Sequence, residues 1–128
     1  MHWQVRAIRG ATTAEANTCS SIQSATWELV HGVTTANNLD PTTIISATFS
    51  VTPDLDVLFP AQVARSYPGW QFVPLLDVQH MVVKGDLPRC IRLLLHINSL
   101  CSQQEIKHIY LRGAQNLRPD LRNPISSP

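Results

Sequence analysis

The sequence predicts an α+β domain with one mixed β-sheet and helices on one face of that sheet. Several short segments are rich in β-branched residues or alternate apolar with polar residues, as strands with one buried face do. A longer segment, between the first two predicted strands, carries apolar residues at helical spacing. The chain has 128 residues, 44% hydrophobic and 15% charged. It is therefore long enough to bury a core but supplies few helices.

The first strand and the main helix are predicted in the N-terminal third of the chain. Residues 3–9 alternate apolar and polar side chains, and Gly10 is expected to end this strand. Asn17 is the expected N-cap of the helix, which ends near residues 37–41. The side chains expected to face the core are Trp3, Val5 and Ala7, with Ile8 as a further candidate, and from the helix Ile22, Ala25, Leu29, Val30 and Val33.

The rest of the chain is predicted to add four strands and two short helices. Pro60 suits the first turn of a helix, where a missing amide hydrogen does no harm. This order of elements gives one mixed sheet covered on one face, and an apolar second face is generally buried by association. We therefore expect a closed homo-oligomer with functional sites between subunits. The predicted strands are residues 44–51, 71–83 with a break in the middle, 90–97 and 107–111, and the short helices are residues 61–67 and a turn starting at Ser102.

Composition argues against several classes of protein. A net charge of +1 does not fit a strongly basic nucleic-acid binder. No apolar run approaches the roughly 20 residues that span a bilayer, and the first residues lack the apolar stretch of a secretion signal. The three cysteines form no CxxC pair, which fits reduced thiols. We therefore expect a cytoplasmic protein that binds neither nucleic acid nor membrane.

The sequence contains no motif for cofactor or covalent chemistry. It has no glycine-rich phosphate loop, no serine elbow and no histidine spacing that suits a metal ion. Asp54 and Asp56 lie in a turn, where we expect them to cap the following segment rather than act as a hydrolytic pair. The sequence therefore predicts a site without metal, cofactor or covalent intermediate.

Arginine is the most informative residue type in this chain. Eight of the ten cationic residues are arginines, whose planar guanidinium suits bidentate capture of carboxylates. Arg92 lies inside an apolar segment, where an unpaired cation costs several kcal/mol. It either meets an anion, forms a structural salt bridge, or lays its stem on the core with its head in water. A site for a small, multiply charged anion is expected from Arg92 together with Arg9, Arg65, Arg118 and Tyr110.

Six short motifs occur in order along the chain: residues 8–13 (IRGATT), 59–61 (FPA) followed by Arg65, 69–74 (GWQFVP), 90–92 (CIR), 108–111 (HIYL) and 117–121 (LRPDL). Together they resemble the monofunctional, trimeric chorismate mutases of the AroH type. The resemblance implies a single domain over residues 1–121, with residues 122–128 as a flexible tail. It also implies a homotrimeric pseudo-α/β-barrel with an active site at each subunit interface.

The implied activity is an isomerisation of chorismate to prephenate, a step in phenylalanine and tyrosine biosynthesis that needs no cofactor. The enzyme holds a dicarboxylate in its reactive conformer and stabilises negative charge on the breaking ether oxygen. By similarity, Arg9 and Tyr110 bind a substrate carboxylate, and Arg92 faces the ether oxygen and a carboxylate. The other implied site residues are Phe59, Ala61 and Arg65 from the neighbouring subunit, Leu117 and Arg118 from a closing tail segment, and Leu76, Asp77 and His80 from the segment after Pro74.

This chain departs from the family pattern where the substrate hydroxyl and ring are bound. His80 stands at the position of the family's glutamate, Asp77 at that of a small polar residue, and Gln62 at that of a common lysine. In one interpretation, which we favour, Asp77 supplies the missing carboxylate and His80 supports it. Since residues three apart in a regular strand point to opposite faces, this requires a bulge or twist.

Two other functions remain open at the level of sequence. If the missing glutamate has degraded the site, the protein is a catalytically weak chorismate-binding or regulatory trimer. A trimeric, imine-hydrolysing deaminase has a related architecture, but the motif at residues 9–13 argues against it.

Overall fold

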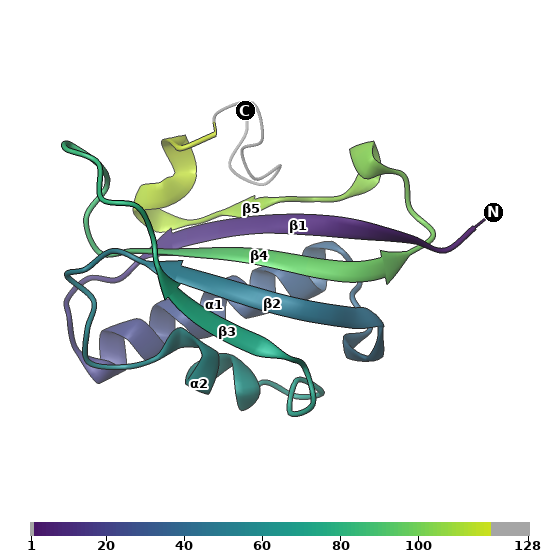
Figure 1. Ribbon diagram of the computed structural model, residues 1–128, viewed down its shortest axis with the longest axis horizontal. Helices are drawn as coiled ribbons and strands as arrows, with labels where there is room; N and C mark the ends of the chain where they lie inside the picture. Colours follow the sequence, from purple (N-terminus) through teal and green to yellow (C-terminus); the bar gives the residue numbers. More distant parts are fainter. Residues whose placement is uncertain (1, 119–128) are drawn as a thin grey trace.

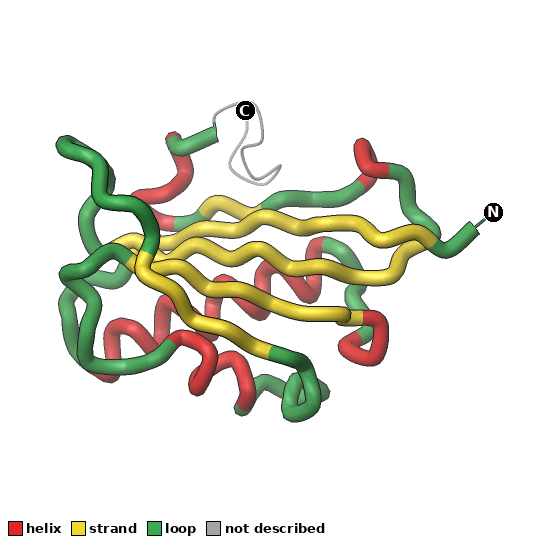
Figure 2. Tube along the Cα trace, viewed as in Figure 1, coloured by secondary structure: helices red, strands yellow, loops and turns green. Residues whose placement is uncertain are grey.

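The computed structural model describes residues 2–118, and these form a five-stranded mixed sheet backed by helices (Figures 1 and 2). The strand order is β3-β2-β4-β1-β5. The central strand β4 is antiparallel to both of its neighbours, β1 and β2. At the two edges, β5 is parallel to β1 and β3 is parallel to β2. The predicted fold class is confirmed. The elements are β1 (Gln4–Thr13), α1 (Cys19–Ala36), η1 (Pro41–Thr43), β2 (Ile44–Val51), α2 (Pro60–Arg65), β3 (Leu75–Gln79), β4 (Cys90–Ser99), η2 (Gln103–Glu105), β5 (Ile109–Tyr110) and η3 (Arg112–Asn116).

The hydrophobic core lies between the sheet and the two α-helices, which both cover the same face (Figure 1). Every residue predicted for the buried face of α1 is buried. Each large apolar side chain that is fully buried contributes roughly 1.5–3 kcal/mol to folding. The sheet supplies the opposite half of this core with Ile8, Phe49, Ile91 and Leu95.

The N-cap of α1 is Thr18 rather than the predicted Asn17. The Thr18 hydroxyl accepts a hydrogen bond from the Ser21 amide at 3.1 Å. Asn17 is engaged elsewhere, because its amide group donates to Asp56 Oδ1 at 2.6 Å and its oxygen accepts from the Asp56 amide at 3.1 Å. Asp56 thus ties its turn back to the start of α1 and does not cap the segment that follows it.

The face of β1 that packs against the core is the opposite of the face that the sequence predicted. Ile8 is fully buried, but Trp3 and Val5 are 63% and 57% exposed. The prediction was right for Ile8 and wrong for Trp3, Val5 and Ala7. The alternation reveals a strand with one apolar and one mixed face, but it does not say which face meets the helices.

Gly10 does not end β1, which continues to Thr13. A Cβ atom at Gly10 would lie 3.0 Å from Leu29 Cδ1. The missing side chain therefore lets α1 pack closely on the middle of the strand.

Strand β3 is much shorter than the predicted strand 71–83. It pairs with β2 in one continuous register, from Leu75 opposite Ala47 to Gln79 opposite Val51. Because β2 ends at Val51, the chain beyond Gln79 has no partner strand, and residues 81–85 are exposed. The predicted strand 107–111 likewise shrinks to Ile109–Tyr110, and the short helix predicted to start at Ser102 is the 3₁₀ helix η2, with Ser102 as its N-cap.

The face of the sheet opposite the helices is open in the described part of the chain. It carries exposed apolar side chains, among them Val5, Leu76 and Leu94. No helix within residues 2–118 is long and apolar enough to cross a membrane.

Candidate active site

Arg9, Arg92 and Tyr110 come together on the open face of the sheet. Ala11 of β1 pairs with Arg92 on β4 and with Tyr110 on β5. Paired residues of neighbouring strands share a face, and Arg9 shares it too because it is two residues from Ala11. The three side chains line a hollow of about 550 Å³, which we call the arginine hollow; its other lining residues include Thr48, Ser50, Leu117 and Arg118.

A small apolar cluster builds one wall of the arginine hollow. Ala11, Tyr110 and Ala114 are buried there, and Leu87 and Leu117 pack against them. This cluster joins β1, β5, η3 and the loop before β4. It therefore fixes the Tyr110 side chain and places Leu117 at the rim.

Arg9 is held through its backbone by His108. The Arg9 amide donates a hydrogen bond to His108 Nδ1 at 2.9 Å. Burial of the imidazole, followed by the charges of Arg9 and Arg118, lowers the pKa of His108. The neutral ring therefore keeps Nδ1 as an acceptor. Several cations facing one hollow make it a site for an anion.

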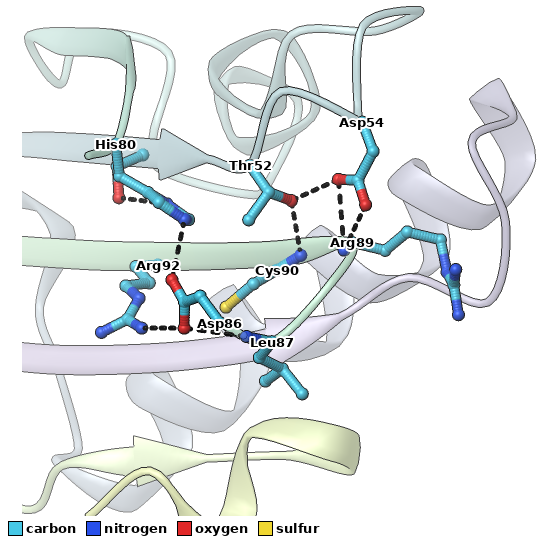
Figure 3. A network of polar contacts seen from close by, with 9 residues as sticks. Thr52, Asp54, His80, Asp86, Leu87, Arg89, Cys90 and Arg92 are labelled. Atoms are coloured by element: carbon cyan, nitrogen blue, oxygen red, sulfur yellow. Dashed lines mark hydrogen bonds and ion pairs between the residues drawn. The ribbon is translucent and has the colours of Figure 1, made fainter. Parts of the chain in front are cut away.

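Arg92 reaches the arginine hollow while a carboxylate lies behind it (Figure 3). Its side chain is 42% exposed, and Nη2 is 3.7 Å from Asp86 Oδ1. The second oxygen of Asp86 is 3.8 Å from His80 Nε2, and His80 Nδ1 is 3.4 Å from the Ser50 hydroxyl. Arg92 thus has an internal counter-ion and still offers its head to a ligand.

A second group of predicted site residues lies at the β3 edge of the sheet. Phe59 is 67% exposed just before α2, and it lines a separate hollow of about 400 Å³ together with Asp77 and Gln62. Ala61 is buried in α2, and Arg65 is exposed in its last turn. One chain therefore carries the predicted site residues in two separate groups, which we call half-sites: one has Arg9, Arg92, Tyr110, Leu117 and Arg118, and the other has Phe59, Ala61, Arg65 and Asp77.

Asp77 faces the helices and not Arg92. It pairs with the buried Phe49 of β2, and its Oδ1 accepts a hydrogen bond from the Ala61 amide at 3.0 Å. Burial raises the pKa of Asp77, against the lowering effects of the Ala61 amide and the Arg65 charge.

The bulge needed to bring Asp77 beside His80 is not found in the β2–β3 pairing. Within one chain Asp77 thus does not stand in for a carboxylate at position 80. Leu76 points to the open face, since its partner Thr48 lines the arginine hollow.

Comparison with known proteins assigns the family. Residues 5–121 match the family model described as chorismate mutase type I. The chorismate mutases AroH of Bacillus subtilis and Thermus thermophilus are 39% and 43% identical to this chain, over 91% and 93% of its length and 92% and 98% of theirs. A solved structure of a chorismate mutase from Clostridium thermocellum has a TM-score of 0.81 and 42% identity, covering 84% of this chain and 96% of that one. The chain belongs to the type I chorismate mutases.

Family membership confirms the resemblance read from the six motifs. Of the last motif, residues 119–121 lie outside the described residues, as does the predicted tail 122–128. Two contacts near the arginines were not predicted from the sequence: that of His108 with Arg9 and that of Asp86 with Arg92. Asp86 stands in a loop without periodicity, so only the three-dimensional path of that loop reveals its place.

Proposed function

We propose that this chain is an isomerase that converts chorismate to prephenate in the cytoplasm, as a step of aromatic amino-acid biosynthesis. The observation that carries the proposal is the arginine hollow, where Arg9, Arg92, Arg118 and Tyr110 converge. The reaction breaks one carbon–oxygen bond and forms one carbon–carbon bond within a single molecule. It therefore needs a binding site that selects a compact conformer, but no proton donor or cofactor.

In this proposal the arginines have two tasks, carboxylate binding and stabilisation of the transition state. Arg9 and Tyr110 bind a carboxylate of the dianionic substrate, and Arg118 with Leu117 closes the rim. Arg92 binds near the ether oxygen, which becomes negative only as its bond to carbon breaks. A fixed cation at that point stabilises the transition state more than the bound substrate, so it raises the rate and not merely the affinity.

We propose a homotrimer in which each complete active site contains half-sites from two neighbouring chains. The support is the separation of the half-sites: the arginine hollow is lined from β1, β2, β4 and β5, whereas Asp77 lies on the edge strand β3 and Phe59 lies just before α2. The open face between them exposes Leu94 and Leu76. In the trimer a neighbour covers these side chains and brings Phe59 as an apolar wall, with Ala61, Arg65 and Asp77, against the arginines.

The direct test is to mix the purified protein with chorismate and follow the loss of chorismate absorbance. The wild-type chain should turn chorismate over, whereas Arg92→Ala should lose roughly 3 kcal/mol of transition-state stabilisation, about 100-fold or more in rate, with an unchanged circular dichroism spectrum. Binding of chorismate without turnover by the wild type would favour the regulatory trimer instead. Near-normal turnover by Arg92→Ala would contradict the role given to Arg92.

A further inference from the structure

Asp86 is the carboxylate that meets Arg92 in this chain, and it meets it from the side away from the arginine hollow. We propose that Asp86 is a positioning residue for Arg92, and that His80 holds Asp86 in place. The inference rests on the proposed function, because it concerns how Arg92 is aimed at the substrate. It also gives His80 a role of its own, although the family has a glutamate at this position.

The geometry separates Asp86 from the substrate space. Arg92 lines the arginine hollow, whereas Asp86 and His80 line a smaller neighbouring hollow of about 220 Å³. Asp86 Oδ1 is 3.7 Å from Arg92 Nη2, and its other oxygen is 3.8 Å from His80 Nε2 (Figure 3). Asp86 therefore acts on the reaction through Arg92 and not by touching the substrate.

The loop before β4 holds both the backbone and the side chain of Asp86. The Asp86 amide donates to Val83 O at 3.1 Å, and Asp86 Oδ1 accepts from the Leu87 amide at 2.8 Å. Leu87 in turn packs into the apolar cluster around Tyr110. The carboxylate thus has a fixed place before it meets Arg92.

The far end of the same loop is clamped to the end of β2. Thr52 Oγ1 accepts from the Cys90 amide at 2.9 Å and donates to Asp54 Oδ1 at 2.5 Å. Asp54 Oδ2 accepts from the Arg89 amide at 2.9 Å (Figure 3). The clamp holds the backbone of Arg89 and Cys90, so the chain between Asp86 and Arg92 is tied down at both ends.

A fixed counter-ion is useful because a half-exposed arginine has many rotamers. Ordering such a side chain costs conformational entropy, and a displacement of about 1 Å can lower a rate about 100-fold. Asp86 contacts one terminal nitrogen of Arg92 and leaves the guanidinium further donors for a ligand oxygen. The Ser50 hydroxyl at His80 Nδ1 leaves Nε2 turned toward Asp86.

The test compares Asp86→Asn with wild type, and with Glu15→Gln as a matched control at an exposed carboxylate. Asparagine can still accept from the Leu87 amide, so the turn is kept while the charge on Arg92's partner is lost. We expect kcat for chorismate to fall about 10- to 100-fold with KM changed less than about threefold. Asp86→Glu, which restores the charge, should recover part of the loss, and Glu15→Gln should match wild type.

A second readout does not depend on turnover. The NMR order parameter of the Arg92 Nε–Hε bond should be lower in Asp86→Asn than in wild type. If both proteins give the same order parameter, the inference is wrong, whether or not the wild type converts chorismate. A lower order parameter in an enzyme that proves inactive on chorismate would instead refute the proposed function and leave the positioning contact standing.

The kinetics separate positioning from simple competition for Arg92. If Asp86 merely occupies Arg92 until substrate arrives, Asp86→Asn will lower KM and leave kcat unchanged, which would overturn the inference. An unchanged kcat and KM would overturn it as well. If His80 acts through Asp86, His80→Gln should lower kcat in the wild-type background and have no further effect in Asp86→Asn, whereas additive effects would remove His80 from the proposal.

Discussion

At the scale of single residues, His108 shows how burial and nearby arginine charges keep a hydrogen-bond acceptor unprotonated. Its Nδ1 accepts the Arg9 amide hydrogen, so a proton on that nitrogen would break the bond and add a cation beside Arg9 and Arg118. Burial and these two charges lower the pKa of His108 from its ordinary value of 6.5. At neutral pH the ring is therefore neutral in both the folded and the unfolded chain.

This lowered pKa predicts a loss of stability in mild acid. As pH falls below 6.5 the unfolded chain binds a proton at His108 before the folded chain does, so the free energy of unfolding falls until the folded pKa is passed. In His108→Asn the side-chain oxygen can accept from Arg9 without titrating. We expect the urea midpoint to fall less between pH 7 and about pH 5 in this variant than in wild type. An equal or larger fall would contradict this role of His108.

How far single residues could be predicted depended on what kind of signal they carry. Arg92 stands out because a cation in an apolar strand is unusual, and the arginine hollow confirms that its head reaches open space. Asp77 and His80 also stand out, but their directions depend on where β3 ends, which is set by the length of its partner β2. Asp86 carries no local signal, because its contact with Arg92 arises from the path of a loop.

At the scale of elements, the alternation in β1 was recognised but its phase was not. Local sequence gives the period of a strand, whereas its orientation depends on which face other elements cover. In this chain Val5 and Ala7 lie on the open face with Arg9, and Ile8 meets α1. The helix face of α1 was predictable residue by residue, because a helix with a single apolar stripe has one way to face the sheet.

The clamp between β2 and β4 makes a prediction at this scale. Thr52 is buried and its hydroxyl accepts from the Cys90 amide. Thr52→Val keeps the shape of the side chain but leaves a buried amide unpaired, so we expect a loss of about 1–3 kcal/mol of unfolding free energy. Thr52→Ser keeps the hydroxyl and should lose less. Urea denaturation at pH 7 measures both, and equal losses would show that packing, not the hydrogen bond, holds the loop.

The clamp also has a pH dependence of definite sign. Burial opposes ionisation of Asp54, but hydrogen bonds from Thr52 and the Arg89 amide, together with the Arg89 charge, lower the pKa of that carboxyl below its ordinary value of 3.8. Its contribution to stability is therefore present above pH 3.8 and is lost as pH falls through the folded pKa. The clamp thus holds the Arg92 strand across the neutral range, whereas the contribution of His108 begins to change at a higher pH than that of Asp54.

At the scale of the whole molecule, the positions of the half-sites determine what a single chain can do. In the proposed function the arginine hollow binds the anionic groups of the substrate, but Phe59 and Arg65 lie at the other edge of the sheet, at α2. An isolated chain would leave the substrate open to water on one side. Association in a closed ring gives every arginine hollow one neighbour and repeats the same contact at each interface.

This arrangement predicts that inactive variants restore one another. Arg92→Ala and Arg65→Ala should each be nearly inactive, but an equal mixture, unfolded together in urea and refolded, should regain about a quarter of wild-type turnover, because one interface in four pairs an intact Arg92 with a neighbour's intact Arg65. Arg92→Ala mixed with Arg9→Ala is the control, since both changes fall in the same half-site, and that mixture should stay inactive. If neither mixture regains activity, or both do, the active site is not shared between chains.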